Sequence, residues 1–122
     1  MIFSTIPAAI EYIRADKLRA LAVTTAMGSQ ALPEIPTVGE LFPGYEASQW
    51  YGVAAPKNTP TEIVEKLNKE INAGLADLKM KARLADLGGV PLPMTPTEFG
   101  KLIAEETVKW GKVIRVANIK AE

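Results

Sequence analysis

Residues 59–71 read TPTEIVEKLNKEI and residues 95–103 read TPTEFGKLI, so the same tetrapeptide precedes two segments with apolar residues at helical spacing. In each copy the first threonine can act as N-cap, the proline as the first helical residue and the glutamate as the reciprocal partner of a capping box. The similarity ends after the tetrapeptide, which argues against an internal repeat. We therefore predict that Thr59 and Thr95 start two amphipathic helices and do not mark a catalytic signature. The apolar positions are Ile63, Val64, Leu67, Ile71, Leu75 and Leu78 in the first helix and Phe99, Leu102, Ile103, Trp110, Val113, Ile114 and Ala117 in the second.

The rest of the chain alternates between strand and helix patterns. Residues 1–3 resemble the end of a buried strand, and the apolar run at residues 18–23 is typical of a strand covered on both faces. Ser4 or Thr5 can cap a helix that reaches about residue 15, and Thr37 can cap a short helix over residues 38–44. Extended segments are expected at residues 46–55 and 90–94. This order predicts an α/β fold with a partly parallel sheet flanked by helices.

The composition excludes several kinds of chemistry. The 122 residues contain 14 basic and 14 acidic side chains, so no net charge favours nucleic acid as a partner. There is no cysteine and no histidine, which excludes thiolate catalysis, histidine bases and zinc sites built on nitrogen or sulfur ligands. No apolar run approaches the roughly 20 residues of a membrane span, and the N-terminal residues lack the pattern of an export signal. A site must therefore use carboxylates, hydroxyls, lysines or backbone groups.

Three loops follow predicted strands and lead toward helix starts, where a parallel sheet binds its ligands. They are residues 3–7, 24–30 and 48–52. In the first, FSTIP, the hydroxyls and the amides of the helix start could receive a carboxylate or a phosphate. On spacing alone, a capping role for Ser4 or Thr5 is the simpler interpretation. Core packing is likewise the simpler interpretation of Trp50, and Glu106 is more simply a half-exposed or lysine-paired carboxylate than a catalytic one.

Several longer motifs, in this order, resemble a known family. They are KLRALAVTT at residues 17–25, LPEIPTVGELFPGYEASQWYGVAAPKNTPTEIVEKLNKEI at residues 32–71, and LGGVPLPMTPTEFGKLIAEETVKWGKVIRVANIKAE at residues 87–122. The chain resembles the C-terminal portion of the Bug receptors, the extracytoplasmic solute-binding proteins of tripartite tricarboxylate transporters. The resemblance implies a truncated two-lobe fold like that of type II periplasmic binding proteins. It assigns residues 1–50 to a remnant of the second lobe and residues 51–122 to a part that returns to the first.

The same resemblance implies a solute-binding protein, or a fragment of one, and not an enzyme. The family captures a small carboxylate for a membrane permease and is periplasmic, whereas this chain has no export signal, so we expect a truncated chain or a misassigned start. The resemblance changes the FSTIP loop from a cap to a ligand loop and adds the segment at residues 48–52 beside the cleft. The implied ligand-binding residues are Ser4, Thr5, Ile6, Pro7, Ala8, Ser48 and Trp50, with no catalytic residue, metal or cofactor.

Truncation also suggests an alternative hypothesis. A chain that has lost part of its fold exposes strand edges and apolar helix faces, which favours pairing between copies. The alternative is therefore a self-associating α/β module that has lost ligand binding. We expect a homo-oligomer, with contact residues among Trp50, Ile63, Leu67, Phe99 and Trp110.

Overall fold

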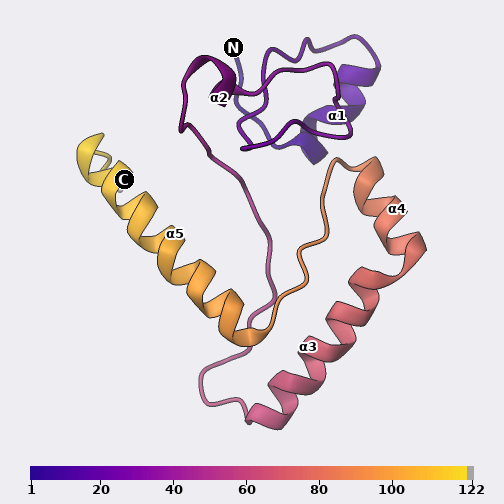
Figure 1. Ribbon diagram of the computed structural model, residues 1–122, viewed down its shortest axis with the longest axis vertical. Coiled ribbons are helices and arrows are strands. Elements are labelled where there is room, and N and C mark those ends of the chain that lie inside the picture. The colour runs from indigo at the N-terminus through magenta and orange to yellow at the C-terminus, as the bar shows by residue number, and fades with distance from the viewer. Residues whose placement is uncertain (121–122) are drawn as a thin grey trace. The chain divides into compact units, whose positions relative to one another are not determined.

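Within residues 1–120, five helices carry most of the regular structure. The computed structural model describes residues 1–120, and Figure 1 follows its helices in chain order from indigo to yellow. They are α1 (Ile6–Arg14), α2 (Val38–Leu41), α3 (Thr61–Ala76), α4 (Leu78–Asp86) and α5 (Pro96–Val116). The predicted helices after Thr5, Thr37 and Thr95 are thus confirmed, the second in a shorter form.

The chain divides into two compact units. The first contains Met1–Ala54 and Gly74–Pro91, and the second contains Ala55–Ala73 and the stretch from Leu92 onward. The first of these boundaries lies near the predicted division at residue 50, but the segment at residues 74–91 rejoins the first unit. The assignment of residues 1–50 and 51–122 to two lobes stays a prediction.

The core of the first unit is small. Ile10 of α1 is fully buried, and Val23 and Thr37 are nearly so. Val23 and Thr37 form a parallel β-bridge, in which the Val23 amide donates to the Pro36 carbonyl and the Val38 amide donates to the Val23 carbonyl, both at 2.9 Å. The pairing of these two segments is parallel, as the predicted sheet requires, but it extends over a single bridge.

The prediction of separate strands is wrong. Residues 1–3, 18–23, 46–55 and 90–94 contain no ladder, and within residues 1–120 the only β-pairing is that of Val23 with Thr37 and a local antiparallel bridge between Ser29 and Leu32. Their composition favours an extended backbone, and most of their residues are indeed outside helices and turns. A strand, however, forms only when a neighbouring segment accepts and donates its backbone hydrogen bonds. The described residues supply such a neighbour only locally, at Val23 and at Ala47, which is too little for a ladder.

The segment predicted as the first amphipathic helix forms two helices, although its apolar periodicity continues across the break. The pattern from Ile63 to Leu78 predicts one helix, but the structure contains a break at Asp77 between α3 and α4. The Asp77 carboxylate caps α4 by accepting from the amides of Lys79 and Met80 at 2.9 and 3.0 Å. An aspartate is a strong N-cap, so it can end one helix and start the next without disturbing the apolar stripe.

The two TPTE segments have different structures. At Thr95, the predicted capping box is confirmed: the Glu98 amide donates to the Thr95 hydroxyl at 3.2 Å, and the Thr95 amide donates to the Glu98 carboxylate at 2.8 Å. At Thr59, the prediction is wrong, because α3 begins at Thr61, so that Pro60 and not Thr59 directly precedes the helix. The Thr59 hydroxyl instead donates to the Pro56 carbonyl at 2.8 Å and closes the preceding turn.

The second unit contains a polar link between α3 and the segment before α5. Asn68 and Asn72, one turn apart on α3, both donate side-chain amide hydrogens to the Met94 carbonyl, at 2.8 and 3.0 Å. Met94 directly precedes the N-cap Thr95. The two asparagines therefore fix which side of α3 faces its own unit.

Candidate functional site

The start of α1 contains five of the predicted ligand-binding residues. Thr5 is the N-cap in an extended conformation, Ile6 is the first helical residue, and Pro7 and Ala8 complete the first turn, with Ser4 exposed before them. The Thr5 hydroxyl makes no capping hydrogen bond, and its carbonyl accepts from the amides of Ala8 and Ala9, both at 3.1 Å. Among residues 1–120, neither the Thr5 amide nor the Ile6 amide has a hydrogen-bond acceptor. Two backbone donors and two hydroxyls therefore meet at this helix start.

The electrostatics of this start differ from those of the other helices. The described starts of α2, α3, α4 and α5 each have a carboxylate, from Glu40, Glu62, Asp77 and Glu98 respectively. The first turn of α1 has no acidic residue. Since a helix N-terminus has a partial positive charge, it attracts an anion when its own chain supplies none. The arrangement at Ser4–Ala8 is therefore suited to an external carboxylate or phosphate.

The C-terminal end of α4 and the Leu87–Gly88 turn that follows it contact both ends of α1. Gly88 lies so close to Ile6 that a Cβ atom at Gly88 would overlap Cγ2 of Ile6 and lie 3.1 Å from its Cβ. At the other end of α1, Nη2 of Arg14 donates to the Asp86 carbonyl at 3.2 Å. Gly88 belongs to the LGG motif at residues 87–89, and a contact across more than eighty residues has no signal in local spacing.

The other two predicted residues lie in the extended segment after α2. The Ser48 hydroxyl donates to the carboxylate of Glu46, two residues earlier, and both Ser48 and Trp50 are half-buried. The segment is joined to the second predicted loop at Thr24: the Thr24 hydroxyl donates to the Ala47 carbonyl at 2.8 Å, and the Ala47 amide donates to the Thr24 carbonyl at 2.9 Å. The structure thus joins the second predicted loop to the residue directly before the third.

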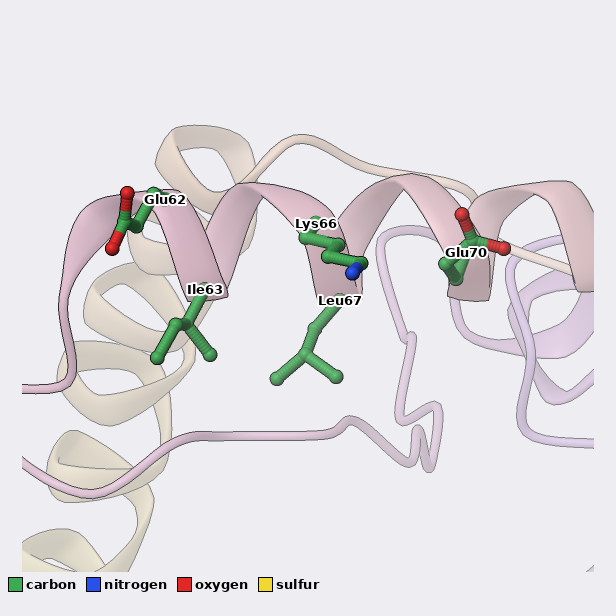
Figure 2. Close-up of a pocket in the computed structure, with 5 residues that line it drawn as sticks. All are labelled: Glu62, Ile63, Lys66, Leu67 and Glu70. Carbon is green, nitrogen blue, oxygen red and sulfur yellow. The ribbon is translucent and has the colours of Figure 1, made fainter.

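Two surface depressions are candidates for a site elsewhere. One, of about 390 Å³ in the first unit, is lined by Ala26, Thr37, Gly39, Glu40, Gly44, Tyr45 and Glu46. Its lining has two carboxylates and no lysine or arginine, so its charge opposes a carboxylate ligand. The other, of about 470 Å³, lies along α3 and is shown in Figure 2. Glu62, Ile63, Lys66, Leu67 and Glu70 line it, all from one helix, so it is an open surface and not an enclosed site.

Glu106, which the sequence predicts to be paired with a lysine rather than catalytic, does make such a pair. Glu106 lies 3.5 Å from Nζ of Lys109 and accepts from Nε1 of Trp110 at 2.7 Å, and Lys109 also lies 5.4 Å from the centre of the Trp110 ring. Within residues 1–120, no group of three or more carboxylate, histidine or cysteine side chains is placed to hold a metal ion. No helix in the same range has both the length and the apolar character needed to cross a membrane.

The comparisons with known proteins support one family. Residues 1–119 match the family described as tripartite tricarboxylate transporter family receptor. Protein BugT of Bordetella pertussis is 37% identical over 115 residues, which are 93% of this chain and 35% of BugT. The chain thus spans about a third of the length of this relative.

Solved structures agree with the sequence comparison. R. palustris Rpa4515 with adipate is 36% identical with a TM-score of 0.85, and the match covers 93% of this chain and 38% of that one. The periplasmic binding protein BugD is 32% identical with a TM-score of 0.84, over 93% of this chain and 39% of that one. The predicted fold class, part of a periplasmic-binding-protein fold, is therefore confirmed. This chain belongs to the receptor family of the tripartite tricarboxylate transporters.

Proposed function

We propose that this chain is the carboxylate-binding part of a solute receptor that delivers a small dicarboxylate to the membrane permease of a tripartite tricarboxylate transporter. The observation that carries the proposal is the start of α1, with two acceptor-free amides and no acidic residue in its first turn. Such a start can bind one carboxylate group of a ligand through backbone amides and the hydroxyls of Ser4 and Thr5. Ser48 and Trp50 are proposed to complete this end of the site.

The related structure with adipate supports the choice of ligand class. Adipate is a linear dicarboxylate, and the protein that holds it is 36% identical to this chain. One carboxylate would bind at the start of α1. The second carboxylate would bind residues in the part of the longer relatives that this chain does not match. The proposal requires no catalytic residue, metal or cofactor. It also implies a periplasmic location, like that of the periplasmic binding protein BugD.

Ligand-dependent stability tests this proposal. The free energy of unfolding should rise with adipate and should not change with adipamide, the neutral diamide of the same length. A ligand present at about 100 times its dissociation constant adds about 2.7 kcal/mol. Equilibrium urea unfolding with each compound measures the difference. A response to a sugar or a metal cation, with none to adipate or other dicarboxylates, would contradict the proposal.

Self-association is a second candidate function, and a specific surface favours it. Ile63, Leu67 and Ile71 form an apolar stripe on α3, and these side chains are 46%, 47% and 37% exposed. Figure 2 shows Ile63 and Leu67 projecting from the same side of the helix. Asn68 and Asn72 hold a different side of α3 toward Met94, so the helix cannot turn the stripe inward without losing both hydrogen bonds. An exposed apolar surface of this kind favours association with a partner, and a second copy of the chain could bury the stripe against its own.

Light scattering over a concentration series tests the second candidate. Leu67→Glu should lower the apparent mass of any assembly, because it places a charge in the centre of the stripe. Lys69→Glu is the matched control, since it introduces the same side chain on the same helix outside the stripe. A wild-type chain that stays monomeric at high concentration, or equal effects of the two variants, would contradict self-association through α3.

A further inference from the structure

Gly88 ends α4 in a conformation that favours glycine. Its φ is +74°, in the left-handed region. The Gly88 amide donates to the Ala85 carbonyl and the Gly89 amide donates to the Leu84 carbonyl, both at 2.8 Å. These two bonds are those of a Schellman motif, which satisfies the last carbonyls of a helix and places its C′ residue in the left-handed region. The left-handed conformation is by itself sufficient reason for a glycine at this position.

The second feature of Gly88 is its contact with α1. A Cβ atom at this position would overlap Cγ2 of Ile6 and would lie 3.5 Å from the Cβ of Ala31. Ile6 is the first residue of α1, and its amide is one of the two acceptor-free donors of the candidate site. At the last residue of α1, Arg14 donates to Asp86, also in the final turn of α4. One helix end therefore contacts both end residues of the helix whose start is the candidate site.

We propose that the Leu87–Gly88 turn is a positioning element for carboxylate binding, because it fixes the direction in which the Ile6 amide points. This inference rests on the proposed function and adds a residue that touches no ligand. The turn packs closely against the Ile6 side chain, so a displacement of that side chain would move the first turn of α1. Backbone donors discriminate ligands only when their geometry is held, so a displaced first turn weakens binding.

The chain supplies a matched control for the test. Gly44 also has a positive φ, +85°, but a Cβ atom there meets nothing within 4 Å. Gly44→Ala therefore introduces the same kind of backbone strain without the contact. Gly88→Ala introduces both. The double variant Ile6→Ala with Gly88→Ala removes the overlapping Cγ2 and keeps the backbone amide of residue 6. It relieves the overlap, while the 3.1 Å approach to the Cβ of residue 6 and the backbone strain remain.

Two measurements on these variants decide the inference. The first is amide hydrogen exchange at Ala8, Ala9 and Ile10, which reports the first turn of α1 without any ligand. The second is the dissociation constant of adipate. We expect Gly88→Ala to accelerate exchange and to weaken adipate binding by about tenfold or more, which corresponds to about 1.4 kcal/mol. Gly44→Ala should do neither, and the double variant should recover most of the loss.

The outcomes separate the inference from the proposed function. Equal effects of Gly88→Ala and Gly44→Ala on exchange, or no recovery in the double variant, would overturn the positioning role. If Gly88→Ala does not fold, folding of the double variant supports the contact, and its failure to fold overturns it. If the wild-type chain does not bind adipate but the exchange pattern is as expected, adipate binding by this chain is contradicted and the mechanical coupling of Gly88 to α1 stands.

Discussion

The starts of α1 and α5 have nearly the same backbone and opposite electrostatics. Both have a threonine N-cap with φ of −75° and an extended ψ, and both have a proline in the first turn. At α5, the third helical residue is Glu98, whose carboxylate accepts from the Thr95 amide and hydroxyl, both at 2.8 Å. At α1, the third helical residue is Ala8, and the Thr5 amide has no acceptor among the described residues.

This difference shows that one residue position decides what a helix start can do. A threonine and a proline are enough to begin a helix, since they fix the backbone entry. The third residue then decides whether the positive end of the helix is occupied by its own chain. A receptor for anions needs a start that its own sequence leaves unoccupied, and α1 meets that condition while α5 does not.

The largest expected effect comes from making α1 like α5. Ala8→Glu installs at α1 the residue that Glu98 supplies at α5, and Ala8 is exposed, so the new side chain fits. The new carboxylate would accept from the Thr5 amide and occupy the place of a ligand carboxylate. We expect adipate binding to weaken by at least about tenfold, which is 1.4 kcal/mol. The free energy of unfolding should rise by about 0.5 kcal/mol, because an acidic residue in the first turn stabilises a helix.

Opposite signs for binding and stability are the diagnostic result. Isothermal titration with adipate gives the first quantity, and urea unfolding gives the second. Ala8→Gln is the control, since it has nearly the same shape without the charge, and it should weaken binding much less. Unchanged adipate affinity in Ala8→Glu would show that ligand does not bind at the start of α1.

The next effect compares the two TPTE segments. Thr95→Ala removes a hydroxyl that caps α5 and should lower the free energy of unfolding by about 1 kcal/mol. Thr59→Ala removes a hydroxyl that donates only to Pro56 in a turn, and should cost about 0.5 kcal/mol or less. Urea unfolding of both variants measures the difference. Neither variant should change adipate affinity, because neither residue lies at the start of α1.

Conservative variants sharpen this comparison. Thr95→Ser keeps a hydroxyl at the N-cap and should restore most of the stability that Thr95→Ala loses. Thr97→Ala changes an exposed threonine in the same tetrapeptide and should have an effect within about 0.5 kcal/mol of zero. Equal losses at Thr59 and Thr95 would mean that both threonines cap their helices in solution.

The helices could be predicted from the sequence better than the strands could. Helix starts depend on side chains within four residues of each other, so Thr5, Thr37 and Thr95 identify α1, α2 and α5 correctly. The same local reasoning fails at Thr59, where α3 begins one residue later than the tetrapeptide predicts and the threonine hydroxyl donates to the Pro56 carbonyl of the preceding turn. Strands depend on distant neighbours, and only Val23 finds one in the described residues.

The candidate site was predictable only in part for the same reason. The hydroxyls and amides at residues 4–8 are adjacent in sequence, so their role as a helix start can be inferred locally. Thr24 and Ala47 are joined across 23 residues, and Gly88 meets Ile6 across a still longer separation. No periodicity or cap signals such contacts. The absence of an acidic residue in the first turn of α1 was visible in the sequence, and it becomes informative only beside the four helix starts that have one.

The smallest expected effect is a difference in pH response between the two helix starts. Hydrogen bonds from the Thr95 amide and then its hydroxyl lower the pKa of Glu98 below its ordinary value. A carboxyl group with a lowered folded-state pKa stabilises the fold at pH values above its unfolded pKa, and this contribution is lost as the pH falls through the folded value.

The Thr95 and Glu98 amide signals in an NMR titration should therefore shift together in acid, with a midpoint below that of an ordinary glutamate. In Thr95→Ala the midpoint for Glu98 should rise, and the Thr5 amide in α1 should show no such step until Ala8→Glu supplies a carboxylate. A Glu98 midpoint that is the same with and without the Thr95 hydroxyl would show that the hydroxyl does not contribute to the lowered pKa.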